Sequence, residues 1–204
     1  MTDTASARQR IYMIRHGETA WSLSGQHTGR TDLPLTENGE QDARKLADRL
    51  RAMEFTRVFS SPLLRARRTS ELAGLAEVAE IEADAVEWDY GDYEGQRSAD
   101  IRKEHADWNV WRDGCPHGET PDELSARVGR HIQRLSELRG NVALFSHGQL
   151  GAALAARWIG LPLIAGQHFA LHPASISILG HEPTHPGRRM IELWNETATL
   201  DRGR

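Results

Sequence analysis

Near its amino terminus the chain runs Ile11-Tyr12-Met13-Ile14-Arg15-His16-Gly17-Glu18, and this run sets the architecture. Its first four residues favour β structure and predict a short buried strand. Because open α/β sheets bind ligands beyond the carboxyl ends of their strands, His16 and Gly17 are expected at a ligand-binding edge. His16 is a candidate nucleophile. Arg15 can bind a phosphate through two hydrogen bonds from its guanidinium, and Gly17 lets backbone N–H groups approach an anion.

A second apolar run farther along the chain ends in the same dipeptide. Residues 142–146 read Val-Ala-Leu-Phe-Ser and are followed by His147 and Gly148. If this second strand lies parallel and adjacent to the first, His147 and His16 come together at one edge of the sheet. The alternative, two unrelated histidines buried for structural reasons, fits a repeated strand-then-His-Gly pattern less well.

Strand and helix signals alternate along the rest of the chain. Thr36 fits a helix N-cap, Thr120 with Glu123 fits a capping box, and Ser61 before a proline fits a third N-cap. The expected helices cover residues 36–53, 61–72, 120–138 and 148–158, and the expected strands cover 11–14, 57–60, 78–81, 142–146, 175–179 and 190–194. The alternation predicts an α/β fold, a three-layer sandwich with a mostly parallel central sheet flanked by helices.

The composition limits the classes of protein that the chain can represent. Of its 204 residues, 39% are hydrophobic, so the chain can bury one sizeable core. We expect a polar leader over residues 1–9 and a single domain over residues 10–204. The net charge of −4 and the pI of about 6.2 give no global basic field for nucleic acid or an anionic membrane.

Cysteine usage and hydropathy indicate the compartment. Cys115 is the only cysteine, which excludes an internal disulfide and fits a reducing environment, and we expect it to be inert. No apolar run reaches membrane-spanning length, and residues 1–10 lack the hydrophobic core of a signal peptide. We therefore expect a cytoplasmic protein with neither a membrane nor a nucleic-acid partner. The sequence leaves the oligomeric state open.

The two His-Gly pairs belong to a longer series of blocks, in an order that resembles the histidine phosphatase superfamily, which has a phosphoglycerate mutase-like fold. The blocks are Arg15–Trp21, Asp32–Thr36, Gly39, Ser61–Ala66, Glu87–Gly91, Glu94-Gly95, Gly118–Thr120 and Ser146–Gly148. The resemblance extends from Ile11 to about Leu179. It implies a small phosphorylated substrate and a reaction that needs neither a metal nor a cofactor.

The resemblance also implies roles for individual residues. His16 is the nucleophile that forms a phosphohistidine, which water then hydrolyses. Arg15, Arg65 and His147 surround the non-bridging oxygens of the phosphoryl group. Glu87 is the general acid that protonates the leaving group, with Asp89 and Glu94 as competing carboxylates.

The outer contacts with substrate are harder to assign. Where the family commonly has an asparagine, this chain has Ser22, a hydroxyl with shorter reach. The substrate-binding candidates are Ser22, Thr28, Gly29, Gly148, Arg68, Arg112 and His117. The last three, together with Arg30, are candidate cations for a second phosphate. Residues 108–118 either form a lid over the pocket or are a long loop anchored by its tryptophans.

Three segments, 21–29, 88–95 and 108–120, resemble the sedoheptulose bisphosphatase-like branch, which implies a sugar phosphate or bisphosphate as substrate. Two alternatives remain: a cofactor-dependent phosphoglycerate mutase, or a non-catalytic protein that binds a phosphorylated ligand. The compact interval between Glu87 and His147 favours a phosphatase over a mutase. A binding protein would need neither a nucleophile nor an acid, yet His16 and Glu87 are both present. The histidines show no metal-ligand spacing, so we expect no metal site.

Overall fold

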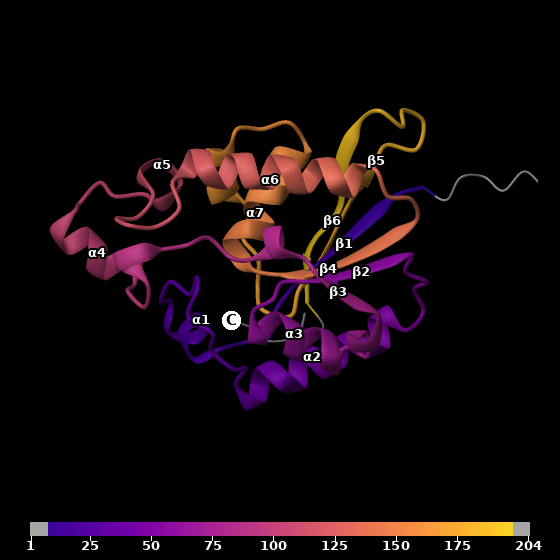
Figure 1. Cartoon of the computed structure of the whole chain (residues 1–204), viewed down its shortest axis with the longest axis horizontal. Helices are drawn as coiled ribbons and strands as arrows, with labels where there is room; N and C mark the ends of the chain where they lie inside the picture. Colours follow the sequence, from indigo (N-terminus) through magenta and orange to yellow (C-terminus); the bar gives the residue numbers. More distant parts are fainter. Residues whose placement is uncertain (1–7, 198–204) are drawn as a thin grey trace, which may run out of the picture.

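The computed structural model describes residues 8–197, so most of the predicted leader over residues 1–9 lies outside the described residues. One six-stranded sheet runs through this part of the chain in the order β3-β2-β4-β1-β5-β6 (Figure 1). The strands are β1 (Arg10–Arg15), β2 (Arg57–Ser60), β3 (Ala79–Ile81), β4 (Asn141–Ser146), β5 (Ile176–His181) and β6 (Arg189–Glu196). Strands β1 to β4 pair in parallel, whereas β5 pairs antiparallel with both of its neighbours, β1 and β6. This confirms the predicted mostly parallel sheet.

Helices cover both faces of the sheet. On one face lie α2 (Glu37–Leu50) and α3 (Leu64–Leu72), and on the other lie α6 (Pro121–Ser136) and α7 (Gly148–Trp158). Side chains of β1 alternate between the two faces, as the pleat of a strand requires. Ile11 and Met13 belong to the core cluster that includes Leu150 of α7, whereas Tyr12 and Ile14 belong to the cluster under α2. The three-layer architecture is therefore confirmed.

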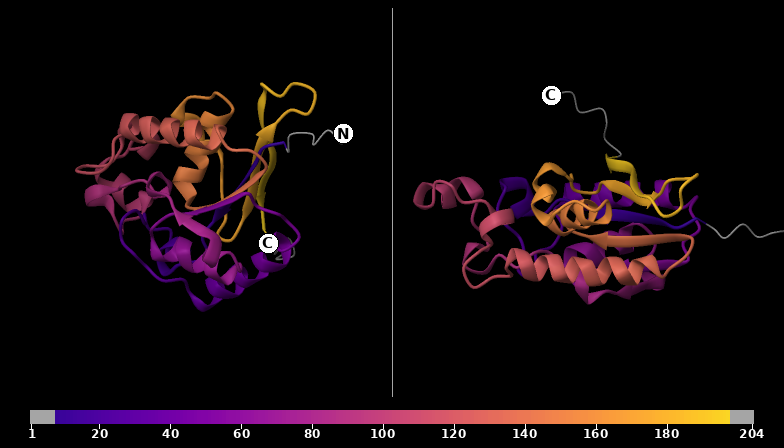
Figure 2. Two further views of the ribbon diagram at one scale, coloured as in Figure 1. Left: turned by 45° about the vertical axis from the view of Figure 1, so that its right-hand side comes forward. Right: turned by 90° about the horizontal axis from the view of Figure 1, so that it is seen from above.

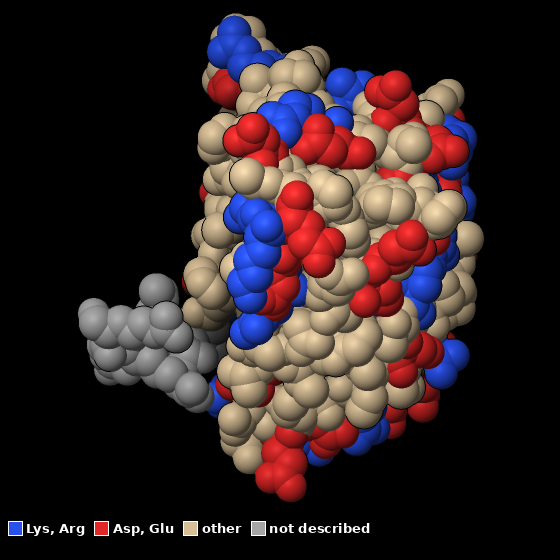
Figure 3. All heavy atoms as spheres, turned by 90° about the vertical axis from the view of Figure 1, so that its left-hand side faces the viewer, with Lys and Arg blue, Asp and Glu red and all other residues tan. Residues whose placement is uncertain are grey.

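Short helices connect the strands and the longer helices. The short helices are α1 (Ala20–Ser24), α4 (Ser98–Glu104) and α5 (Val110–Asp113), and the 3-10 helices are η1 (Ala76–Val78), η2 (Ala83–Ala85), η3 (Gly91–Tyr93) and η4 (Leu163–His168). Figure 2 shows α4 and its flanking loops projecting beyond the sheet. On this end of the molecule, basic and acidic side chains are interspersed (Figure 3). Within residues 8–197, no helix is long and apolar enough to cross a membrane.

The segment from 108 to 118 is anchored by its tryptophans. Trp108 and Trp111 are both buried, and the indole N–H of Trp108 donates to Gly114 O at 2.8 Å. Trp111 packs edge-on against Trp88, with ring centroids 5.3 Å apart. The aromatic residues therefore belong to the core, which favours the anchored-loop interpretation over a lid.

The predicted caps were right for two helices and wrong for one. Thr36 caps α2 and Thr120 forms a capping box with Glu123 at α6, as predicted. The predicted N-cap at Ser61 is wrong, because α3 begins at Leu64 and its first N–H donates to the distant Asp32 Oδ1 at 2.6 Å. The hydroxyl of Ser61 instead lies 2.8 Å from Nε2 of His147.

His131 lies on α6 with its side chain in the core. It is 1% exposed, and neither ring nitrogen has a hydrogen-bond partner among the described residues. Burial lowers the pKa of His131 from 6.5 to about 4; Asp84 opposes this shift, and nearby arginines add to it. The imidazole is therefore neutral in the folded protein at neutral pH.

We expect His131 to make the fold sensitive to acid. The folded pKa of about 4 lies below the unfolded value of 6.5, so the unfolded chain binds the proton more tightly than the folded protein does. The free energy of unfolding is therefore at its full value above pH 6.5 and decreases as the pH falls toward 4. Because leucine does not titrate, this decrease in the free energy of unfolding at acidic pH should be smaller by up to about 3 kcal/mol in His131→Leu. Urea unfolding of wild type and variant at neutral and at acidic pH measures the difference. An identical pH dependence in both proteins would show that His131 does not titrate as argued.

Candidate active site

The parallel pairing of β1 with β4 brings the two histidines together. Arg15 is in register with Ser146, so His16 and His147 follow at the same edge, and His16 N donates to Ser146 O at 3.0 Å. The imidazole rings lie 5.3 Å apart between centroids. His16, but not His147, lines a pocket of about 260 Å³ beyond the carboxyl ends of the strands. Its lining is Arg15, His16, Ser22, Gly25, Gln26, His27, Thr28, Glu87, Tyr90, Ser98, Gly148 and Gln149.

His16 is held as a neutral imidazole in a defined tautomer. Its Nδ1 lies 2.7 Å from Gly17 O, and because a carbonyl only accepts, Nδ1 carries the proton. Nε2 is then the nitrogen with the free electron pair. Burial, followed by the charges of Arg15 and Arg65, holds the pKa of His16 well below 6.5. The ring is therefore neutral at neutral pH and its Nε2 carries no proton, as nucleophilic attack requires.

His147 is the opposite tautomer. Arg65 Nε donates to its Nδ1 at 3.2 Å, so its Nε2 carries the proton and donates to Ser61 Oγ at 2.8 Å. Burial and the neighbouring Arg65 hold the pKa of His147 well below 6.5. His147 is therefore neutral before substrate binds, and the positive charge at this edge comes from the arginines.

Arg65 is fully buried, so it is not a solvated charge on the surface of α3. Besides His147, its guanidinium donates to three backbone carbonyls of the loop at residues 28–31 at 2.9 to 3.0 Å. One of its five N–H groups remains available on Nη1. Arg65 thus fixes the loop that closes the pocket and joins it to the second histidine.

Arg15 is half-buried, and its Nε is shielded from solvent. Its Nη1 donates to Leu171 O, and its Nε has no hydrogen-bond partner among the described residues. Burying an arginine N–H without an acceptor is costly, and an anion in the pocket can supply one. Gly148 lies against this guanidinium, since a Cβ atom there would be 3.4 Å from Arg15 Cζ.

Glu87 reaches the pocket from the segment that follows η2. Its Oε1 accepts from Trp88 N at 3.0 Å and Leu150 N at 2.8 Å, and its Oε2 accepts from Gln149 N at 3.0 Å. The carboxyl group therefore sits on the first turn of α7, where free N–H groups point. Oε2 keeps one lone-pair position that no backbone group fills.

The competing carboxylates lie elsewhere. Asp89 accepts from Gly91 N at 3.0 Å and pairs with Arg30 at 3.4 Å, beside a separate pocket. Glu94 accepts from Gly29 N and Thr31 N, at 2.8 and 3.0 Å, so it supports the loop. Of the three acidic candidates, Glu87 alone lines the pocket with His16.

The inner substrate candidates differ in how they contribute. Thr28 and Ser22 line the pocket, but the hydroxyl of Ser22 donates to Thr19 O at 3.0 Å within the α1 cap. Gly29 does not line it: a Cβ there would be 2.4 Å from Trp88 O, so close packing of the loop requires glycine. Contact between Gly29 and substrate is not supported by this arrangement.

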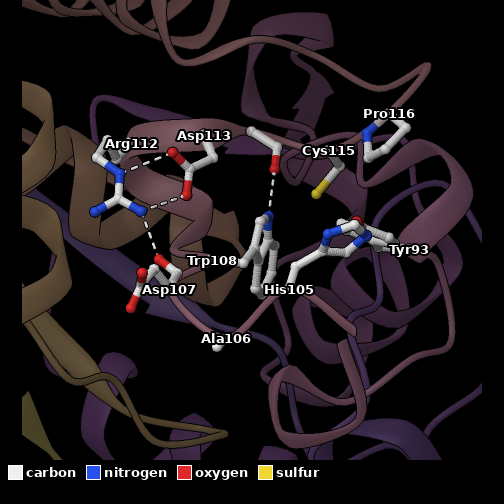
Figure 4. Close-up of a pocket in the computed structure, with 10 residues that line it drawn as sticks. Tyr93, His105, Ala106, Asp107, Trp108, Arg112, Asp113, Cys115 and Pro116 are labelled. Carbon is white, nitrogen blue, oxygen red and sulfur yellow. Dashed lines mark hydrogen bonds and ion pairs between the residues drawn. The ribbon is translucent and has the colours of Figure 1, made fainter. Parts of the chain in front are cut away.

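The four cations predicted for a second phosphate are outside the pocket lining, and one of them, Arg30, pairs with Asp89 at 3.4 Å. Arg68 pairs with Glu40 and Glu71 between α2 and α3, both at 2.8 Å. Arg112 pairs with Asp113 beside a separate pocket of about 550 Å³ (Figure 4). His117 pairs with Asp92 at 2.8 Å, and its side chain is 84% exposed. The expectation that these residues gather around one substrate is therefore not supported.

Several lining residues were not predicted. Gln26, His27, Tyr90, Ser98 and Gln149 all face the pocket. His27 stacks on Tyr90 with centroids 4.6 Å apart, and its Nε2 lies 3.1 Å from Ser98 Oγ. Burial lowers the pKa of His27 to about 4, so it is a neutral polar group. His27 and Tyr90 lie in blocks that the resemblance includes, whereas Ser98 and Gln149 carry no sequence signal.

Two further expectations concern Cys115, predicted to be inert, and a metal site, predicted to be absent. Burial raises the pKa of the Cys115 thiol to about 12, with Asp89 and Glu94 adding to the effect, which fits an unreactive thiol. Within residues 8–197, no group of three or more His, Cys, Asp or Glu side chains is arranged to hold a metal ion.

Comparison with known proteins places this site in context. The profile of the histidine phosphatase superfamily (branch 1) matches residues 11–197. An acid phosphatase from Mycobacterium tuberculosis is 41% identical over 188 residues, covering 90% of this chain and 91% of the relative. Sedoheptulose 1,7-bisphosphatase from Saccharomyces cerevisiae is 36% identical over 190 residues, covering 76% and 69%. A solved structure of an open reading frame product from Mycobacterium tuberculosis has a TM-score of 0.87 at 39% identity, covering 93% of this chain and 98% of that one.

Proposed function

Since the chain belongs to the histidine phosphatase superfamily and is a phosphatase, we propose that it hydrolyses the phosphomonoester of a sugar-like alcohol through a phosphohistidine. The observation that carries the proposal is the neutral His16, with its Nε2 free, beside Arg15 and Arg65 and in one pocket with Glu87. A nucleophile, a cationic cradle and an acid are the groups that a two-step phosphoryl transfer needs.

In the first step, Nε2 of His16 attacks phosphorus, forming a P–N bond while the P–O bond to the alcohol breaks. Glu87 gives its proton to the departing oxygen, and the arginines stabilise charge on the non-bridging oxygens. In the second step, water attacks phosphorus and gives a proton to Glu87. The P–N bond breaks, inorganic phosphate leaves, and His16 returns to its neutral state.

The leaving-group side of the pocket favours a neutral, hydroxyl-rich alcohol. Its lining carries the hydroxyls of Thr28 and Ser98 and the amides of Gln26 and Gln149, which suit sugar hydroxyls. The relationship to the yeast sedoheptulose bisphosphatase also supports a sugar. Because the candidate cations for a second phosphate are paired elsewhere, a monophosphate fits better than a bisphosphate.

A turnover screen tests the proposal. For sugars tested as both esters, we expect phosphate release from the monophosphate to be about tenfold or more faster in kcat/KM than from the bisphosphate. Excess chelator should leave the rate unchanged, because the chain's own arginines supply the positive charge. Transfer of phosphate between phosphoglycerates without release would favour a mutase instead. If chelator abolished the rate and only added magnesium restored it, a metal ion rather than the arginines would supply the positive charge.

A further inference from the structure

A buried ion pair lies behind the segment that carries Glu87. Arg127 of α6 is 7% exposed, and it donates from Nε and Nη2 to the two carboxylate oxygens of Glu119 at 2.7 and 2.6 Å. This is a two-point pair with little access to water. Neither residue lines the pocket that holds His16.

The remaining N–H groups of Arg127 hold the backbone that leads to Glu87. Nη1 donates to Asp84 O and Val86 O, both at 2.8 Å, and Nη2 donates to Glu87 O at 3.4 Å. All five N–H groups of the guanidinium are thus directed at Glu119 or at this segment. An arginine in this arrangement cannot move without releasing the backbone of Glu87.

Glu119 holds the same segment from its other end. Its backbone N–H donates to Asp89 O at 3.0 Å, and its carbonyl accepts from the indole N–H of Trp88 at 2.7 Å. Trp88 is fully buried, so that hydrogen bond cannot be exchanged for one to water. Residues 84–89 are therefore clamped on both sides of Glu87.

We infer that Arg127 and Glu119 are positioning residues that hold the carboxyl group of Glu87 at the leaving-group oxygen. This inference rests on the proposed function, in which Glu87 is the acid. Proton transfer needs the two heavy atoms within about 2.6–3.2 Å, and a misplacement of about 1 Å can slow a reaction on the order of a hundredfold. The pair acts through Glu87, since neither side chain reaches the pocket.

Two variants test the inference. A double variant, Arg127→Met with Glu119→Met, removes both buried charges together and so leaves no unpaired ion. Arg127→Lys keeps the charge but not the fork that holds the carbonyls. The matched control is Arg130→Met, on the same helix, because Arg130 is exposed and pairs with Asp84 only at 3.5 Å. Thermal unfolding verifies that each variant is folded, and Arg127→Lys is used alone if the double variant is not.

The kinetic measurement compares two esters. An alkyl phosphate needs a proton on its leaving group, whereas 4-nitrophenyl phosphate does not. In the Arg127 variants we expect kcat/KM for the alkyl ester to fall by about tenfold to a hundredfold, and for the nitrophenyl ester by less than about threefold. The control should leave both rates unchanged. Equal losses for both esters, or no loss for either, would overturn the inference.

A second measurement does not depend on catalysis. The amide N–H groups of Gln149 and Leu150 donate to Glu87, so their NMR signals report where its carboxyl group lies. Both signals should shift in the Arg127 variants and stay in place in Arg130→Met. Unshifted signals in folded Arg127 variants would overturn the inference even if activity falls. If the wild type releases phosphate from neither ester, the proposed function fails, and these signals still decide the positioning role.

Discussion

His16→Ala is expected to lose turnover by on the order of a thousandfold or more, because it removes the imidazole that forms the proposed covalent intermediate. The Nδ1 of His16 donates to Gly17 O, and its Nε2 carries the free electron pair. His147 cannot take over, since its Nδ1 accepts from Arg65 and its Nε2 carries a proton.

Steady-state phosphate release measures this loss, and quenching during turnover without acid should trap phosphate on His16 of the wild type. His185→Ala is the matched control, because that side chain is 64% exposed on the hairpin and should be dispensable. Normal turnover in His16→Ala, or label on another residue, would mean that the reaction does not pass through this histidine.

Glu87→Gln is expected to separate two kinds of substrate. A glutamine fits the same space and can keep two of the three backbone hydrogen bonds, but it has no acidic proton to give. Hydrolysis of a sugar phosphate should therefore slow by about a hundredfold to ten-thousandfold, the range for loss of general acid catalysis. Hydrolysis of 4-nitrophenyl phosphate should change far less, because nitrophenolate leaves without a proton.

The kcat values for the two esters are compared with those of Asp89→Asn, which removes a carboxylate outside the pocket. That control should not discriminate between the substrates. If both esters instead slow equally in Glu87→Gln, Glu87 orients water or substrate and a different group is the acid.

Local sequence patterns were sufficient to predict the frame of the site. Each apolar run followed by His-Gly became a central strand, and parallel pairing placed His16 beside His147 as predicted. A capping box was enough to predict the start of α6, since this signal lies within the first turn of the helix itself. These features depend on neighbours in the sequence.

Features that depend on neighbours in space could not be predicted in the same way. Arg68 was expected at the substrate, but it forms an ion pair with Glu40 on another helix. Ser61 was expected to cap a helix, but its hydroxyl accepts from His147. Arg127 carried no signal at all, because its role depends on backbone carbonyls some forty residues away.

The position of β1 in the sheet has a consequence for how the protein is made. Among the six described strands β1 leaves the ribosome first, but its neighbours are β4 and β5, which begin at Asn141 and Ile176. During synthesis His16, the proposed nucleophile, therefore lies at the end of an unpaired, apolar segment until most of the chain has emerged. Chaperones that bind exposed strands have their longest opportunity at this segment, and translation stopped before Asn141 would leave a nascent chain without its active site.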